Sequence, residues 1–278
     1  MDDIKPIGSF YRVDHEGYIV NDTSWEKIES TYRNAINRSV NLLTLQLPLH
    51  SIYIRGSVPR GNGIEGVSDL DFIVISEQDA NEEIIEKVER KLTKEFPWLN
   101  GIEVSYSSLH NLNDLDSFTI IPFMLKTSSL CVYGKDITDK LPRYKIDRAL
   151  ANDHLIQLEK HIEQAKFELD GHQDEEDIAD CCGWIMKIMV RSGLALVMEY
   201  KRRYTRDLYP AYQLFSSIYP HRELDMKQAL TYAIHPSRSP EEIVRFLDGF
   251  GKWMINEADQ WQEEFNPTRE QHLPIPRN

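Results

Sequence analysis

One stretch of the chain constrains its fold more than any other. Residues 51–75 read SIYIRGSVPRGNGIEGVSDLDFIVI. Alternating apolar residues at the start predict a short strand that ends at Arg55, and the run from Asp69 to Ile75 predicts a second, largely buried strand. A loop rich in glycine joins them. We therefore expect two neighbouring strands of one sheet.

Two carboxylates occupy one face of the second predicted strand. Asp69 and Asp71 are two residues apart, so their side chains project from the same face, while Leu70, Phe72 and Val74 face a core. Carboxylates that share a buried face repel each other unless a cation lies between them. Mg²⁺ suits such a pair, because it binds one or two carboxylates and completes its shell with waters and substrate phosphates.

The turn after the first strand adds a candidate phosphate site. Gly56 allows backbone N–H groups to approach a phosphate closely, and the Ser57 hydroxyl adds a donor. Metal-binding carboxylates beside such a turn predict a site that transfers a nucleotidyl group from a nucleoside triphosphate (NTP). The alternative is a glycine-rich hairpin that carries two solvated aspartates.

These residues resemble a known family. Gly56-Ser57, a spacer and Asp69-Leu70-Asp71 are similar to the signature of the DNA polymerase beta-like nucleotidyltransferase superfamily. The fuller strings at 55–61 and 68–71 resemble its bacterial small-substrate and toxin-like branches, which include the aminoglycoside nucleotidyltransferases. The motif covers about a tenth of the chain. The resemblance implies an α+β fold, in which a mixed-sheet palm domain precedes an all-α helical bundle.

The resemblance also implies a third acidic residue on the next strand. Glu103, in the alternating segment 102–106, matches that position. It would complete the ligand set of one metal ion and help to deprotonate an acceptor hydroxyl. The alternatives are that Glu103 is an exposed strand residue, or that Asp114 or Asp116 takes the role from a loop.

Further substrate-binding residues follow from the resemblance. Lys187, on an apolar predicted helix, matches a lysine that reaches the triphosphate, although it could equally extend from a core helix to solvent. Tyr204 matches a position from which a tyrosine could stack on the base. Arg60 either steadies phosphates or braces the loop.

Periodicity and punctuation divide the chain into two expected domains. We expect a palm domain over 1–143 and a helical bundle over 144–278, because Pro142 and a charged stretch mark a boundary and only helical periods follow. Ser239 is the expected N-cap of the last helix. The other expected elements are a hairpin in 8–22, helices from about 24 to 43, 81–96, 150–169, 177–200, 222–234 and 240–265, and a turn at 204–209.

Charge bears on the acceptor. The net charge of −13 favours a cationic small molecule or a protein over a long nucleic acid, because phosphate contacts dominate nucleic-acid binding. One local basic patch, at 201–203 with Arg206, is the exception; it is equally well explained as a solvated helix end.

Other features exclude several classes of protein. No apolar run reaches the roughly 18 residues of a membrane span, and the acidic start predicts no signal peptide. Three cysteines without metal-ligand spacing fit reduced thiols in a cytoplasm. No histidine spacing indicates a zinc site. Nothing in the sequence indicates an oligomeric state.

The sequence therefore predicts a cytoplasmic nucleotidyltransferase that uses two Mg²⁺ ions and an NTP, with ATP as the expected nucleotide. Asp69, Asp71 and Glu103 would hold the ions, and a small aminoglycoside-like hydroxyl compound is the leading acceptor. One alternative is a toxin or defence enzyme that modifies protein or tRNA or makes a nucleotide signal. Another is an NTP-binding regulatory module without catalysis.

Overall fold

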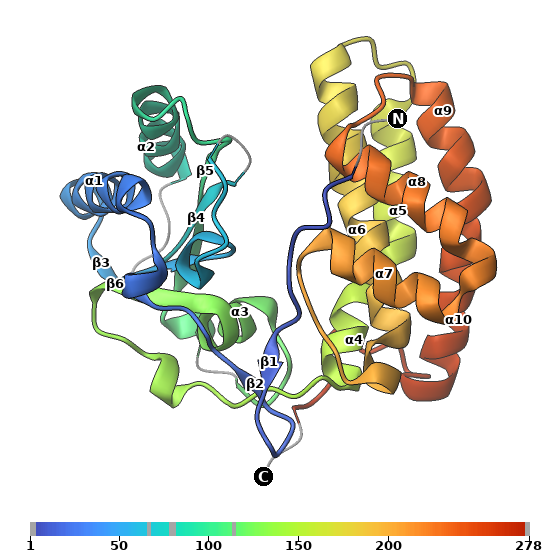
Figure 1. Cartoon of the computed structure of the whole chain (residues 1–278), viewed down its shortest axis with the longest axis horizontal. Helices are drawn as coiled ribbons and strands as arrows, with labels where there is room; N and C mark the ends of the chain where they lie inside the picture. The colour runs from blue at the N-terminus through green and yellow to red at the C-terminus, as the bar shows by residue number, and fades with distance from the viewer. Residues whose placement is uncertain (1–3, 66–67, 78–81, 113–114, 276–278) are drawn as a thin grey trace. The chain divides into compact units, whose positions relative to one another are not determined.

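The computed structural model describes residues 4–65, 68–77, 82–112 and 115–275. They form two compact units, drawn in Figure 1. The sheet unit contains residues 12–14 and 18–144, and the helical unit contains residues 4–11, 15–17 and 145–275. The predicted α+β class, with a mixed sheet and a helical region, is confirmed.

The sheet unit is built on a four-stranded sheet with the strand order β5-β4-β3-β6. β4 and β5 are parallel, whereas β3 is antiparallel to both β4 and β6, so the sheet is mixed. A short hairpin of β1 and β2 confirms the one predicted in 8–22. The elements are β1 (Arg12–Val13), β2 (Ile19–Val20), α1 (Ser30–Gln46), β3 (Leu49–Arg55), β4 (Leu70–Ser76), α2 (Glu82–Glu95), β5 (Ile102–Ser108), α3 (Ile120–Ser128) and β6 (Ser129–Gly134).

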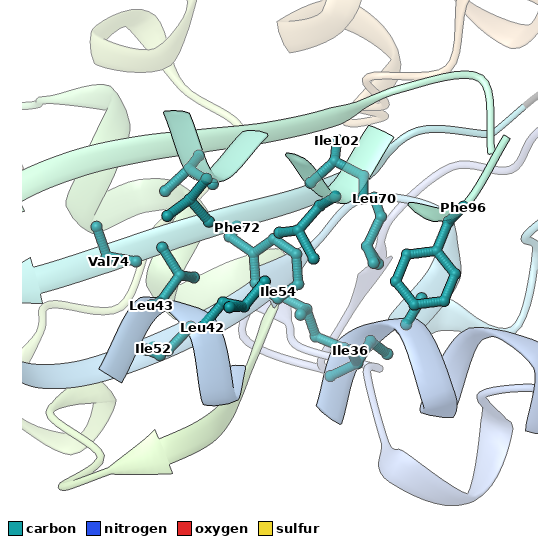
Figure 2. Packing of buried hydrophobic residues seen from close by; sticks show 14 of the residues in the cluster. Ile36, Leu42, Leu43, Ile52, Ile54, Leu70, Phe72, Val74, Phe96 and Ile102 are labelled. Carbon is teal, nitrogen blue, oxygen red and sulfur yellow. The ribbon is translucent and has the colours of Figure 1, made fainter. Parts of the chain in front are cut away.

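Helices α1 and α2 cover one face of this sheet. The alternate residues Leu70, Phe72 and Val74 of β4 are fully buried there, as predicted, and pack with Ile52 and Ile54 of β3. Figure 2 shows these side chains against those of α1. Because successive strand residues face opposite sides, Arg55 and Asp71 lie on the other face. The core on one face thus fixes which residues the opposite face presents.

The helical unit surrounds α6, which contacts α4, α5, α7, α8 and α10. Although Lys187 and Arg191 interrupt its apolar run, α6 is long and apolar enough to cross a membrane by length and composition, and 72% of its apolar window is buried. That burial is typical of a core helix. The elements are α4 (Arg148–Leu155), α5 (Leu158–Leu169), α6 (Glu175–Lys201), α7 (Leu208–Ile218), α8 (Glu223–Ile234), α9 (Pro240–Phe246), a π-helical turn (Leu247–Gly251) and α10 (Lys252–Phe265).

Several predicted helices differ in extent. The predicted helix at 150–169 is two helices, and the predicted helix at 240–265 is interrupted by a π-helical turn that contains Gly249 and Gly251, both poor helix formers. α7 was not expected. It accommodates Pro210 in its first turn, where a missing N–H costs no intrahelical bond. The N-cap prediction for Ser239 is confirmed, because its side chain accepts from the Glu242 N–H.

Candidate active site

The turn after β3 brings the backbone against a carboxylate. Gly56 has a φ of +88°, which an L side chain rarely adopts, and a Cβ built there would lie 2.9 Å from Asp71 Oδ2. The backbone angle therefore favours glycine at this position, and a Cβ there would also displace the end of the Asp71 side chain. The turn and the Asp71 carboxylate form one packed unit.

Charged side chains form a row across three strands. Arg55 of β3 is directly opposite Asp71 of β4, and Asp71 is the register partner of Glu103 of β5. Residues paired in register project from the same face of a sheet. Arg55 Nη2 lies 3.4 Å from Asp71 Oδ1 and 3.8 Å from Glu103 Oε2. We call Arg55, Asp71 and Glu103 the charged row.

Exposure differs along the charged row. The side chains of Arg55 and Asp71 are 16% and 17% exposed, whereas that of Glu103 is 66% exposed. Glu103 thus lies on the same side as Asp71 while it remains open to solvent. An accessible carboxylate next to a semi-buried one is suited to exchange protons with a bound molecule.

Asp69 has a separate environment. It directly precedes β4, and its Oδ1 accepts a hydrogen bond of 2.8 Å from Asn100 Nδ2. The same oxygen lies 3.0 Å from the place that a Cβ of Gly101 would occupy. The link between α2 and β5 therefore positions Asp69 through a side-chain amide and a close glycine.

The glycine-rich loop is closed by serine hydroxyls. Ser57 Oγ lies 3.1 Å from Ser68 Oγ, which in turn accepts from the Ile64 N–H at 3.0 Å. The Ser57 carbonyl accepts from the N–H groups of Arg60 and Asn62. The Ser57 hydroxyl therefore has a partner within the loop and would have to rotate to donate to a phosphate.

Arg60 braces this loop. Its side chain is 4% exposed, and its Nε lies 3.2 Å from Asp22 Oδ1. Of the two roles considered for Arg60, this geometry favours the structural one, because a guanidinium so deeply buried has little access to a ligand. Its phosphate role stays a prediction.

Glu89 of α2 holds the strand that carries Glu103. Its Oε1 accepts a hydrogen bond of 2.6 Å from the Val104 N–H on the edge strand β5. Burial, and then the negative charge of Glu103, raise the pKa of Glu89, while the bond from Val104 opposes that shift. Glu89 thus holds the β5 backbone at Val104, the residue that follows Glu103.

The donor set of the charged row fits a divalent cation. Asp71 and Glu103 offer the carboxylate oxygens that Mg²⁺ prefers. In this structure the Arg55 guanidinium is the positive group that lies beside these oxygens. Within the described ranges, no three His, Cys, Asp or Glu side chains are arranged as a ready metal cluster. Mg²⁺ commonly uses only one or two protein carboxylates, so the pair is sufficient.

Lys187 and Tyr204 belong to the helical unit. Lys187 is exposed on α6, and no ion pair involves it among the described residues. Tyr204 is fully buried; its ring packs edge-on against Tyr11, and its hydroxyl lies 3.2 Å from His154 Nε2. The predicted phosphate contact of Lys187 remains untested, and the burial of Tyr204 gives no support to base stacking.

Two residues of this region were not predicted. Arg55 could have been found from the alternation of β3, because it shares a face with the carboxylates once the strands are paired. Asn100 has no sequence signal, since only the fold brings it to Asp69. Of the rival acids, Asp114 lies outside the described residues, and Asp116 is an exposed residue in a bend.

Comparison with known proteins gives one structural likeness to report. No family model and no curated protein matches the chain. A crystal structure of the spectinomycin adenyltransferase AAD(9) from Enterococcus faecialis, with ATP and spectinomycin, overlaps 82% of this chain and 99% of its own. The TM-score is 0.47 and the sequence identity is 15%. An overlap this loose transfers no function from one protein to the other.

Proposed function

We propose that this chain is a metal-dependent nucleotidyltransferase that moves a nucleoside monophosphate from an NTP, with ATP as the expected nucleotide, to a hydroxyl acceptor. The observation that carries the proposal is the charged row beside the Gly56 turn. Partly buried carboxylates next to a glycine turn suit a triphosphate that arrives with divalent cations. The resemblance of Gly56, Ser57, Asp69 and Asp71 to the polymerase beta-like signature also supports it.

The residues would take distinct roles. Asp71 and Glu103 would hold one Mg²⁺. Asp69, the third predicted ligand, is bonded to Asn100 in this structure and would join the first ion, and share a second with Asp71, only after its side chain turns toward them. When bound, such ions neutralise the phosphates and lower the pKa of a hydroxyl. The backbone of Gly56 and the hydroxyl of Ser57 would orient the β- and γ-phosphates. Glu103, the most exposed member of the charged row, would take the proton of the acceptor hydroxyl.

A small cationic polyhydroxy compound is our leading acceptor. The net charge of −13 favours a cation. A depression of about 380 Å³ in the sheet unit is lined by Ser30, Thr31, Asn34, Glu65, Phe96 and Trp98. Because α1 and α2 cover the face of the sheet opposite the charged row, this depression is not assigned to the acceptor.

A nucleic-acid acceptor is the second candidate, and one observation favours it. Lys87 lies three and four residues before Arg90 and Lys91, and Lys94 lies four and three residues after them, so the four share one side of α2 and line a depression of about 490 Å³. Arg90 is paired with Glu86, but no ion pair involves the three lysines within the described ranges. A row of free cations on an acidic protein suits a phosphodiester backbone.

The test is transfer itself. Each of the four NTPs, labelled at the α-phosphate, is incubated with Mg²⁺ and aminoglycosides, tRNA or whole-cell lysate, and label on the acceptor and pyrophosphate release are both measured. Transfer that requires Asp71 supports the proposal. Nucleotide binding without pyrophosphate release from any mixture would instead identify a regulatory module.

The two acceptor classes predict opposite sensitivities. A small amine acceptor predicts that the pair Lys87→Glu and Lys91→Glu leaves transfer unchanged. A tRNA acceptor predicts the reverse, with transfer that falls steeply as salt rises.

A further inference from the structure

Arg55 is poorly coordinated for an arginine that is mostly buried. Its two ionic contacts, at 3.4 and 3.8 Å, are longer than the 2.7–2.9 Å typical of charge-assisted hydrogen bonds. Its Nε is buried and has no hydrogen-bond partner among the residues that the structure describes. Arg60, in the following turn, contrasts with it, since its Nε bonds to Asp22 at 3.2 Å. Arg55 therefore has donor capacity that its protein neighbours leave unused.

The position of Arg55 suggests which ligand its unused hydrogen-bond donors could bind. It is the last residue of β3 and directly precedes Gly56 and Ser57. Its guanidinium lies near the carboxylates of Asp71 and Glu103, and the residue is next in sequence to the candidate phosphate turn. A guanidinium binds phosphate with two parallel hydrogen bonds, which a single carboxylate contact at 3.4 Å does not provide.

We propose that Arg55 is an exchangeable counter-ion: it neutralises Asp71 and Glu103 when no divalent cation is bound, and it binds the triphosphate once a divalent cation takes its place. This inference rests on the proposed function and adds a residue to the nucleotide site. Two neighbouring carboxylates require nearby positive charge. The single charge of Arg55 competes with the double charge of a metal ion for the same oxygens. An incoming NTP offers the displaced guanidinium a better partner.

The exchange predicts opposite effects on two ligands. In Arg55→Gln, Mn²⁺ alone should bind at least about five-fold more tightly, because its competitor is gone. The non-hydrolysable analogue α,β-methylene ATP, in the presence of Mg²⁺, should bind at least about ten-fold more weakly, because a phosphate partner is gone. A purely structural role for Arg55 would weaken both ligands or neither.

The measurements need no catalysis. Mn²⁺ binding is followed by electron paramagnetic resonance, nucleotide binding by calorimetry, and folding by circular dichroism. Arg38→Gln is the matched control, because Arg38 pairs with a single carboxylate, Glu95, outside the charged row. Arg55→Lys keeps the charge but not the planar fork. It should bind Mn²⁺ like the wild type and the nucleotide more weakly, and it serves as the test if Arg55→Gln does not fold.

Each outcome decides between the claims. Tighter Mn²⁺ with weaker nucleotide in Arg55→Gln, and no change in Arg38→Gln, supports the exchange. If the wild type binds both ligands and Arg55→Gln binds them equally well, Arg55 has no such role while the proposed function stands. If the wild type binds neither ligand, the proposed function fails and the exchange fails with it.

Discussion

Replacing Gly56 by alanine should cost stability for two separable reasons. The first is the backbone: a φ of +88° costs a non-glycine residue about 1–2 kcal/mol, partly offset by the lower entropy of the unfolded chain. Gly17 isolates this cost, because it has a φ of +85° and nothing would lie within 4 Å of its Cβ. Gly17→Ala should therefore lower the free energy of unfolding by about 1 kcal/mol.

The second reason is specific to the candidate site. A Cβ at Gly56 would lie 2.9 Å from Asp71 Oδ2, closer than real Cβ atoms approach, so the carboxylate must move. The atom that must move is the outer end of a short side chain, so the displacement should cost about 1 kcal/mol, the low end of the cost of overpacking. Gly56→Ala should thus destabilise by about 2 kcal/mol in total, and it should weaken nucleotide binding, which Gly17→Ala should not.

A double-mutant cycle tests this reasoning by urea denaturation. With Asp71→Ala in the background, the carboxylate is absent, and Gly56→Ala should cost only about 1 kcal/mol, as at Gly17. The coupling free energy between the two sites should then be about 1 kcal/mol. An equal cost of Gly56→Ala in both backgrounds would refute the packing of Asp71 against the turn.

Three further predictions follow from single residues. Asp69→Asn should abolish transfer and keep the thermal midpoint, because an amide oxygen can still accept from Asn100; normal transfer would refute its metal role. Lys187→Ala should raise the KM for the NTP about ten-fold, as loss of one charged hydrogen bond implies, whereas Lys252→Ala, at another exposed lysine of the helical unit, should not; equal KM values for the two variants would remove Lys187 from the site. Burial, with two nearby guanidinium groups, lowers the pKa of His154 to about 3. Below about pH 6.5 the unfolded chain therefore binds a proton at this histidine that the folded chain does not bind. The free energy of unfolding should then decrease as the pH is lowered, by up to about 1.4 kcal/mol per pH unit. Urea denaturation of His154→Gln at pH 7 and pH 5 should show a smaller loss than the wild type; an equal loss would contradict the assignment.

The strands of the sheet unit were predictable because their residue alternation is strong. Leu70, Phe72 and Val74 are buried on one face, and this burial alone places Asp71 on the other. Residue patterns predicted that β3 and β4 are neighbours, but they did not predict the register of any pair of strands. The register that puts Arg55, Asp71 and Glu103 in one row arises from contacts between segments far apart in the chain.

The residues that sequence reasoning missed depend on tertiary contacts. Asn100 reaches Asp69 from a loop with no periodic pattern. The bracing contact of Arg60 depends on Asp22, which is 38 residues away in sequence. α7 was missed because Pro210 suggests the end of a turn, although proline is tolerated in the first turn of a helix. Local patterns specify which face of an element is apolar, whereas its partners are set by the fold.

The central claim is that Asp71 and Glu103 together bind a divalent cation. Crystals grown with Mn²⁺ and α,β-methylene ATP would locate that ion by its anomalous scattering. The account predicts a peak about 2.0–2.4 Å from carboxylate oxygens of both residues, with the Arg55 guanidinium moved from between them to the phosphates. A nucleotide bound with its manganese away from both carboxylates, and Arg55 still paired with Asp71, would contradict it.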